Sequence, residues 1–198
     1  MVIPNPALPQ LPSLSQHKFK RRDLMPLGNS LLWQIDVGVV RTSTWNEEGT
    51  LVTLGFWGPG DIVGQPLSQI NPYQIECLTT VEAWILPVDC WNFHQAMLSH
   101  IQQTEELLRI IHCKHVECRL LQFLNWLARR FGREVAQGQL IDLPLTHQDI
   151  AQDIGTTRVT VTRLLNRFKQ EGKIILSGQR CILLTATIPQ SKWHPYGG

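Results

Sequence analysis

Hydrophobic and polar residues alternate with a period of two through the first half of the chain. The stretch "LLWQIDVGVVRTSTW" (31–45) alternates on both sides of one glycine, and "LVTLGFW" (51–57) follows it after the turn sequence "EEGT" (47–50). A second turn sequence, "GPGD" (58–61), precedes "YQIECLTTVEAWILP" (73–87), which contains two more candidate strands. Short strands separated by glycine turns predict a small antiparallel sandwich or barrel.

The period becomes helical between about residues 88 and 131. Four side chains recur at helical spacing and would share one stripe of a continuous helix: Ile101, Leu108, Ile111 and His115. A helix that is apolar on two adjacent faces can pack on its own domain and on a second copy of the chain. We therefore expect residues 97–118 to form a dimerisation helix with these four side chains in the interface. The stretch "CRLLQFLNWLARRFG" (118–132) predicts another amphipathic helix, which ends at Gly132.

The stretch "LTHQDIAQDIG" (145–155) has the pattern of a short helix followed by a turn. It begins with Thr146, and Asp149 three residues later gives a pattern close to a capping box, with aspartate in place of the usual glutamate. Ile150 and Ile154 lie on an apolar face of this helix. Gly155 then allows a residue in the left-handed conformation. A helix that ends in a tight turn is therefore predicted here.

The next stretch, "TTRVTVTRLL" (156–165), is rich in β-branched residues, but its period is helical. Four apolar side chains fall at i, i+3, i+4 and i+7: Val161, Leu164, Leu165 and Phe168. On a strand, Arg163 would share the apolar face, so the helix is favoured over the strand. Helix, turn and helix form a helix-turn-helix unit. The following "KIILSGQRCILLTA" predicts two short strands around the Ser177–Gly178 turn, as in the wing of a winged helix.

The exposed face of the second helix carries side chains that suit duplex DNA. Arginine can form two hydrogen bonds with the edge of guanine, and a branched side chain can pack on the methyl group of thymine. Hydroxyl and amide groups suit phosphate oxygens, which is the role we expect for Gln148, Thr156, Thr157 and Thr160. The candidate DNA contacts are Thr146, Gln148, Thr156, Thr157, Arg158, Val159, Thr160, Thr162, Arg163, Asn166, Ser177 and Arg180.

Composition adds an uneven distribution of charge. The chain has 198 residues, of which 43% are hydrophobic, and a net charge of +2. Residues 119–184 hold ten Lys or Arg and five Asp or Glu, whereas residues 42–108 hold eight acids and no Lys or Arg. This asymmetry indicates two modules, of which the second is a candidate for binding a polyanion. No apolar run spans a bilayer and the proline-rich start is unlike a signal peptide, so we expect a cytoplasmic protein.

The cysteines and histidines raise the question of a metal site. The five cysteines contain no CxxC pair, which favours reduced thiols over a disulfide framework. His112, His115 and Cys118 would lie on one side of a helix, and their donor atoms suit zinc or copper. A four-ligand site needs a second segment, and no nearby Cys/His pair supplies it. We assign no metal here, and the alternative of a helix seam with a hydrogen-bonded histidine stays open beside a metal site.

Along almost its full length the chain resembles the CRP/FNR family of bacterial transcription regulators. The resemblance rests on "LTHQDIAQDIGTTRVTVTRLL" for the recognition unit, "EEGTLVTLGFWGPGDIVG" for the sensor hairpin and "CRLLQFLNWLARRFG" for the junction between the dimerisation helix and the DNA-binding domain. It implies an α+β chain with an N-terminal antiparallel β jelly roll like a cyclic-nucleotide-binding domain, a long dimerisation helix and a C-terminal winged helix-turn-helix. The recognition helix is most similar to the nitrogen-control (NtcA-like) branch. The resemblance implies that Arg158 and Arg163 contact bases, while Val159 stands where many members have glutamate.

The chain departs from the family in the expected effector pocket. Cyclic-nucleotide members follow the GD-x-x-G turn with a glutamate and, later, an arginine beside a serine or threonine. Here Gln65 and Pro66 follow that turn, and "SQINPYQIECL" contains no arginine. Burying an anion without a cation is costly, so we expect no cyclic nucleotide as cofactor. The candidate effector contacts are Arg41, Arg109 and Lys114, and Lys114 best matches a basic residue that the nitrogen-control branch uses for 2-oxoglutarate, so that ligand stays open.

These observations predict a sequence-specific, homodimeric DNA-binding transcription regulator with a degenerate effector pocket. The expected segments are a leader (1–16), a barrel-like sensor domain (17–96), the dimerisation helix (97–118), the winged helix-turn-helix (119–186) and a tail (187–198). The expected partners are double-stranded DNA with a pseudo-palindromic operator, a second copy of the chain and RNA polymerase, with no membrane. The alternative is an enzymatic or small-molecule-binding barrel, but no nucleophile–base motif or phosphate-binding glycine loop appears, so we expect no enzyme.

Overall fold

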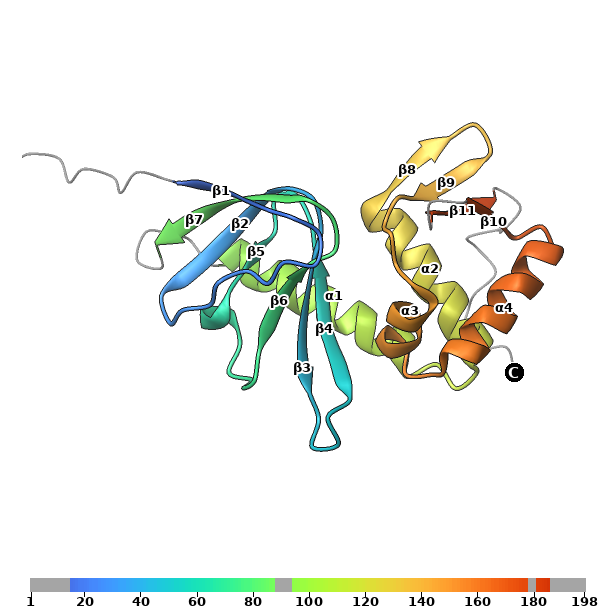
Figure 1. Cartoon of the computed structure of the whole chain (residues 1–198), viewed down its shortest axis with the longest axis horizontal. Coiled ribbons are helices and arrows are strands. Elements are labelled where there is room, and N and C mark those ends of the chain that lie inside the picture. Colours follow the sequence, from blue (N-terminus) through green and yellow to red (C-terminus); the bar gives the residue numbers. More distant parts are fainter. Residues whose placement is uncertain (1–14, 88–93, 178–180, 186–198) are drawn as a thin grey trace, which may run out of the picture.

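The protein folds into two lobes joined by a long helix (Figure 1). The structure is a computed structural model that describes residues 15–87, 94–177 and 181–185. A β-sandwich forms the first lobe, and helices with a small antiparallel sheet form the second. The α+β class and the order of its parts are those that the sequence predicts. None of the described helices combines the length and the apolar composition needed to cross a membrane.

The sandwich consists of two antiparallel sheets. Its strands are β1 (Gln16–Phe19), β2 (Leu31–Val37), β3 (Val40–Trp45), β4 (Leu51–Trp57), β5 (Ile62–Val63), β6 (Gln74–Cys77) and β7 (Val81–Pro87). One sheet has the order β1-β7-β2-β5 and the other β4-β3-β6, and a short 3-10 turn (Gln65–Leu67) follows β5. The strands predicted from the alternating pattern are confirmed as β2, β3, β4, β6 and β7. β1 and β5 were not predicted, because β5 has only two residues and β1 begins with three polar, exposed residues that show no alternation.

Gly38 explains why the first alternating run divides into two strands. It makes the turn between β2 and β3 with a φ of 92°, and a Cβ at this position would lie 2.1 Å from the carbonyl oxygen of Thr80. Only a residue without a side chain fits both the left-handed backbone and this close approach. The chain therefore crosses from one sheet of the sandwich to the other at this glycine.

The helical segment contains the two predicted helices, but the boundary between them differs from the prediction. α1 (His94–Ile111) and α2 (Val116–Phe131) are separated by a turn at residues 112–115. The prediction of one helix over 97–118 is therefore wrong at its C-terminal end, and His115 is the N-cap residue of α2. The chain changes direction there because α2 buries its own apolar face, from Leu120 to Ala128, against the second lobe and the sandwich.

The second lobe is a winged helix-turn-helix. It contains α3 (His147–Asp153), α4 (Arg158–Gln170) and the strands β8 (Gly132–Val135), β9 (Gly138–Ile141), β10 (Ile174–Ser177) and β11 (Cys181–Thr185). Its sheet has the order β10-β11-β9-β8. The two helices and the wing strands β10 and β11 are confirmed, whereas β8 and β9 were not predicted. Gly132 ends α2, as predicted, and it also begins β8. The helical periodicity of this stretch gives no indication of the strand.

Candidate DNA-binding interface

α4 has one face in the core of its lobe and one face in solvent. The four apolar residues predicted to be buried are each at most 4% exposed: Val161, Leu164, Leu165 and Phe168. Thr157 caps the N-terminus, because its Oγ1 accepts a hydrogen bond from the backbone N–H of Thr160 at 3.2 Å. The β-branched run is therefore helical: packing and an N-terminal cap outweigh its strand propensity.

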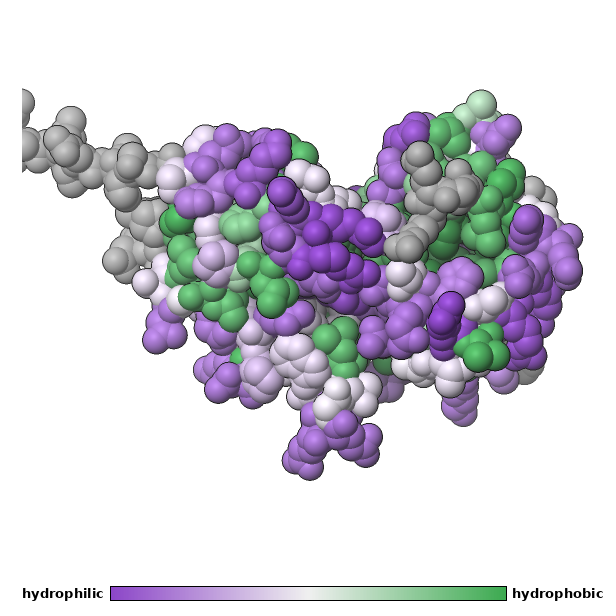
Figure 2. All heavy atoms as spheres, in the orientation of Figure 1, coloured by the Kyte–Doolittle hydropathy of each residue, from purple (hydrophilic) through white to green (hydrophobic). Residues whose placement is uncertain are grey.

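The solvent face of α4 carries hydrogen-bond donors on both sides of one exposed apolar side chain. Arg158, Arg163 and Asn166 are exposed, and Val159 is 77% exposed. Figure 2 shows hydrophilic side chains over the outer side of α4. An open groove follows this face and is lined by Arg158, Val159, Thr162, Arg163, Leu164, Asn166, Arg167 and Gln170. Burial of apolar surface is favourable, so an exposed valine on a basic surface gains free energy when a partner covers it. Val159 is therefore suited to a contact with a bound partner.

Hydrogen bonds inside the unit decide which threonines can still donate to a phosphate. Thr146 donates its hydroxyl proton to Asp149 at 2.7 Å and accepts from the Asp149 backbone N–H at 3.0 Å, so the predicted capping box is confirmed. Thr162 donates to the backbone carbonyl of Arg158 at 2.9 Å. Each hydroxyl has a single proton. Thr146 and Thr162 therefore have no hydroxyl proton left for a phosphate in this conformation, and their role as DNA contacts stays a prediction.

Thr157 and Thr160 keep one proton for an external acceptor. Their hydroxyl oxygens lie 2.9 Å apart, so one proton lies between them and the other is left to point outward. Thr156 precedes them in the turn, and Gln148 is exposed in the first turn of α3. Thr156 and Thr157 lie beside the N-terminus of α4, where the helix dipole favours negative charge. These residues keep their predicted role as candidate phosphate contacts.

His147 links the two helices and was not predicted. Its Nδ1 lies 2.8 Å from the hydroxyl oxygen of Thr162. Because the Thr162 proton goes to a backbone carbonyl, His147 is the donor in this hydrogen bond. Burial and then the charge of Arg158 lower the pKa of His147, so its imidazole is neutral at pH 7. The two partners are 15 residues apart, and no local pattern identifies such a contact.

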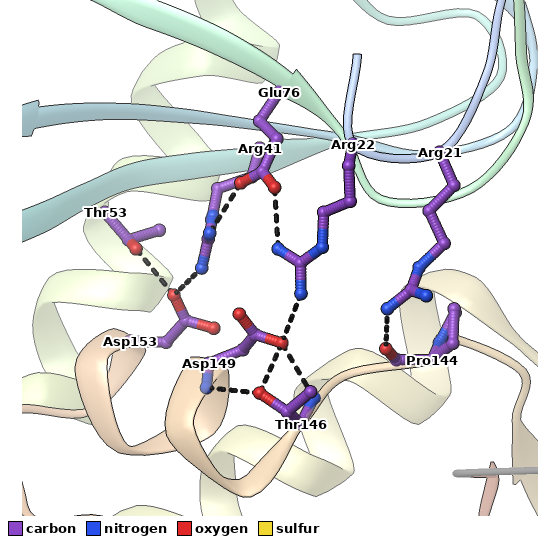
Figure 3. Close-up of polar contacts among 9 residues, drawn as sticks. All are labelled: Arg21, Arg22, Arg41, Thr53, Glu76, Pro144, Thr146, Asp149 and Asp153. Carbon is purple, nitrogen blue, oxygen red and sulfur yellow. Dashed lines mark hydrogen bonds and ion pairs between the residues drawn. The ribbon is translucent and has the colours of Figure 1, made fainter. Parts of the chain in front are cut away.

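An ionic cluster, buried except for the partly exposed Arg22, joins the sandwich to α3 (Figure 3). Arg41 of β3 lies between Glu76 of β6, at 2.6 Å, and Asp153 of α3, at 3.0 Å. Arg22, in the turn after β1, contacts the second oxygen of Glu76 at 2.6 Å and Asp149 of α3 at 2.9 Å. We refer to these five residues as the ionic cluster. It spans the two lobes and places two arginines of the sandwich against two carboxylates of the helix-turn-helix.

Two further contacts extend the ionic cluster. Thr53 of β4 donates its hydroxyl proton to the same oxygen of Asp153 that Arg41 contacts, at 2.6 Å. Arg21 donates to the backbone carbonyl of Pro144, just before α3, at 2.6 Å. The second oxygen of Asp153 has no hydrogen-bond partner within the described residues. The sandwich therefore holds α3 through its two carboxylates and through the segment that leads into it.

Burial and neighbouring charges set the protonation of the ionic cluster. Burial raises the pKa of Asp153 to about 6, although Arg41 and Thr53 act in the opposite direction. Burial also acts on Asp149, but hydrogen bonds from Thr146 and Arg22 outweigh it and lower the pKa of this carboxyl. For Arg41, burial lowers the pKa, and the carboxylates of Asp153 and Glu76 more than reverse the effect. Arg41 therefore stays charged.

The ionic cluster overturns the prediction that Arg41 contacts an effector. Its side chain is 4% exposed and two of its nitrogens already pair with carboxylates, so it is not available to an anion. Arg109 of α1 donates to Gln122 of α2 at 3.3 Å, and Lys114 is exposed in the turn between these helices. The three candidate effector contacts therefore have three different environments and do not form one site.

Two predicted contacts and the metal alternative remain to be placed. Ser177 ends β10 but its side chain is not described, and Arg180 lies outside the described residues. His112 follows α1, and its Nδ1 contacts the carbonyl of Leu108 at 2.9 Å. The turn between α1 and α2 removes the continuous helix on which His112, His115 and Cys118 would share one side. Within the described residues, no group of three or more His, Cys, Asp or Glu side chains is placed to hold a metal.

Comparisons with known proteins agree with this architecture. Residues 118–186 match the Crp-like helix-turn-helix domain. The regulatory protein CysR of Synechococcus elongatus is 44% identical over 172 residues, which cover 85% of this chain and 84% of that protein. The chain belongs to the CRP/FNR family of transcription regulators.

Further relatives bear out the family assignment. The global nitrogen regulator of Synechococcus elongatus is 42% identical over 161 residues, 72% of each chain. A CRP-family transcriptional regulator from Thermus thermophilus superposes with a TM-score of 0.72 at 21% identity, over 85% of this chain and 91% of the other. The fold and the family are thus those of the resemblance found in the sequence, and this CRP/FNR member is a DNA-binding transcription regulator.

Proposed function

We propose that this CRP/FNR regulator binds a pseudo-palindromic operator as a homodimer, with α4 of each copy in the major groove. The solvent face of α4 carries the proposal, because the candidate base contacts lie on the exposed face of a helix whose other face is buried in the core. Half-sites one helical turn apart require two recognition helices related by a two-fold axis. One copy supplies one such helix, so two copies match one operator.

The side chains of α4 divide the recognition between them. We assign Arg158 and Arg163 to guanine edges, with which an arginine can form two hydrogen bonds. Val159 offers a methyl surface to thymine, where a glutamate would instead accept a hydrogen bond from cytosine. Asn166, one turn further along, suits adenine or a phosphate. A preference for sites with a thymine opposite Val159 follows from this arrangement.

Contacts with the DNA backbone orient α4 without selecting sequence. Gln148, Thr156, Thr157 and Thr160 surround the entrance to α4 and keep donors for phosphate oxygens. We also assign Ser177 and Arg180 of the wing turn to the backbone, since a wing borders the groove that the recognition helix occupies. Thr146 and Thr162 use their hydroxyl protons inside the protein, so any contact they make with DNA would be as hydrogen-bond acceptors or through their methyl groups.

We assign the dimer interface to an exposed apolar stripe on α1. Met97, Ile101, Thr104 and Leu108 follow one another at spacings of four, three and four, which is the seam of a coiled coil. Ile101 is 52% exposed and Leu108 53%. Ile111 continues the stripe but is partly buried against the core of its own chain, so it contributes to both surfaces. A second copy would bury this stripe, and His115 lies beyond it.

The remaining assignments concern the sensor lobe and the cell. We propose that residues 17–96 form a sensor domain with a degenerate pocket, because residues 42–108 contain no Lys or Arg and Arg41 is committed to the ionic cluster. As a regulator bound to DNA, the dimer would act on RNA polymerase and work in the cytoplasm. Residues 119–186 form the DNA-binding domain in this proposal, with α1 and the turn after it as the dimer segment.

Selection of bound duplexes from a random pool gives the operator and tests the proposal. We expect a sequence with two inverted half-sites. At this selected operator, Arg158→Ala and Arg163→Ala should each cost about 1–3 kcal/mol of binding free energy and relax base preference at one position.

Gln148→Ala is the matched control for these two variants. A lost phosphate contact should weaken binding to all sequences alike without changing the selected sequence, and the salt dependence should stay the same because glutamine carries no charge. The assignment of α4 fails if Arg158→Ala binds every duplex as tightly as the unchanged protein. The dimer assignment fails if the selected sequences contain a single half-site.

A further inference from the structure

The ionic cluster holds the helix-turn-helix by α3, the helix that packs against α4. We propose that Arg22 and Arg41 are positioning residues for DNA recognition, which fix α3, and through it α4, in one orientation on the sandwich without a bound effector. The proposal rests on the DNA-binding function argued above. It follows from the placement of charges, from the division of contacts between the lobes and from the backbone at Arg22.

The two carboxylates of α3 lie close together and need positive charges from outside the helix to offset their repulsion. Asp149 and Asp153 are four residues apart, so they lie on one face of a seven-residue helix. Like charges at this spacing destabilise an isolated helix. Their side chains are only 8% and 0% exposed. Two buried carboxylates on one turn are compatible with a folded α3 because Arg22 and Arg41 face them from the sandwich.

The contact between the lobes is mainly apolar on α2, which adds one ion pair between Arg130 and Asp61 at 3.0 Å, and it is ionic on α3. Phe56 of β4 packs against Phe123 and Trp126 of α2, with ring centroids 5.7 and 5.6 Å apart. Apolar surfaces attract without a preferred direction, whereas guanidinium–carboxylate pairs require defined distances and angles. Buried ion pairs add little net stability but can select one arrangement. The ionic half of the contact is therefore the part that sets the orientation of α3.

Arg22 occupies a backbone conformation that favours glycine. Its φ is 75°, and no other non-glycine residue among those described has a positive φ. It lies in the turn from Lys20 to Asp23, where the Asp23 N–H donates to the Lys20 carbonyl at 3.1 Å. Glycine is the usual residue in such a turn, and a side chain there is strained. An arginine at this position is accounted for by its guanidinium, which reaches both Glu76 and Asp149.

The substitution Arg22→Gly distinguishes an effect on the orientation of α3 from an effect on the stability of the sandwich. It relieves the strained turn and removes the contact with α3, so the sandwich should remain folded. Lys18→Gln is the control, because Lys18 forms an exposed pair with Glu82 inside the sandwich, at 2.7 Å, and does not take part in the ionic cluster. Arg41→Gln is the second variant, and it tests the more deeply buried half of the cluster.

Two measurements on the full-length dimer test the proposal. The first is affinity for the selected operator across a range of salt concentrations. We expect Arg22→Gly to bind the operator about tenfold more weakly. Such a loss corresponds to about one tenth of the molecules having α4 in the orientation that binds DNA. Its salt slope should match that of the unchanged protein, because no phosphate contact is lost. The second is hydrogen exchange, which should become faster in α3 and β4 and stay unchanged in β2 and β7. Lys18→Gln should alter neither.

The outcomes separate this proposal from the DNA-binding function. If Arg22→Gly and Arg41→Gln both keep the affinity and the exchange pattern, the proposal is wrong. If exchange in α3 speeds up while operator affinity stays the same, the arginines hold the lobes together but do not position α4, and the proposal is wrong as stated. If the unchanged protein bound no duplex, the DNA-binding assignment would fail, while exchange would still report whether the arginines hold α3.

Discussion

At the scale of single residues, Asp153 has a pKa that burial raises well above that of an ordinary aspartate. The ionic cluster contains three carboxylates and two guanidinium groups, and Asp153 is its most buried member. Burial raises its pKa from 3.8 to about 6. A group whose pKa is higher in the folded protein contributes stability below its unfolded pKa and loses that contribution as the pH rises through the folded value. For Asp153 the change falls between about pH 4 and pH 7.

Asp153→Asn removes this titration and gives the first prediction at this scale. The asparagine oxygen can still accept hydrogen bonds from Thr53 and Arg41. Relative to the variant, the unchanged protein should lose up to about 3 kcal/mol of unfolding free energy as the pH rises from 4 to 7. Urea unfolding of both proteins at several pH values measures the difference. His100 and His147 have lowered pKa values and titrate in this range with the opposite sign, but they are common to both proteins and cancel. If the difference in unfolding free energy between the two proteins did not change with pH, the raised pKa of Asp153 would be wrong.

At the scale of elements, α1 carries the exposed seam that we assign to the dimer. Replacing Ile101 and Leu108 together by glutamate places four like charges in a two-fold interface, and we expect monomers in sedimentation experiments and loss of operator binding. Ile111 is left unchanged because it also packs on its own core. Gln102→Glu, which adds an exposed charge outside the seam, should leave the dimer intact. A double variant that remains dimeric would place the interface on another element.

At the scale of the whole molecule, we expect DNA binding that needs no cyclic nucleotide. Residues 42–108 contain no Lys or Arg. The positive charge of the nearby Arg41 is balanced by its ion pairs with Glu76 and Asp153. An anion buried in the sandwich would lack a cation, so cyclic AMP and cyclic GMP should bind no tighter than about millimolar. Calorimetric titration of the dimer is the measurement, and micromolar affinity for either nucleotide would overturn this expectation.

The same titration decides the case of 2-oxoglutarate. Lys114 is exposed in the turn between α1 and α2, where it is free to reach a carboxylate from solvent. Affinity for 2-oxoglutarate that disappears in Lys114→Ala would relate this chain functionally to the nitrogen-control branch. Affinity that survives in Lys114→Ala would place the ligand elsewhere.

The sequence by itself determined the features that depend on neighbours along the chain. The period of two predicted five strands of the sandwich, and the spacing of four apolar residues predicted the buried face of α4. The capping box of Thr146 and Asp149 followed from a spacing of three. The polar face of the recognition helix and the family resemblance followed in the same way. Such features are visible in sequence because helices and strands repeat over a few residues, and a local hydrogen bond needs only a local pattern.

Only the tertiary structure decided where the helical segment breaks and what Arg41 does. The turn before Val116 arises because α2 packs into a core that residues from both lobes share. Arg41 and Asp153 are 112 residues apart, and Arg22 and Asp149 are 127 apart. In the sequence, each of these residues is an ordinary charged residue on an element of its own. Their pairing, the raised pKa of Asp153 and the loss of Arg41 as an effector contact depend on two lobes meeting in space, which no periodicity along the chain encodes.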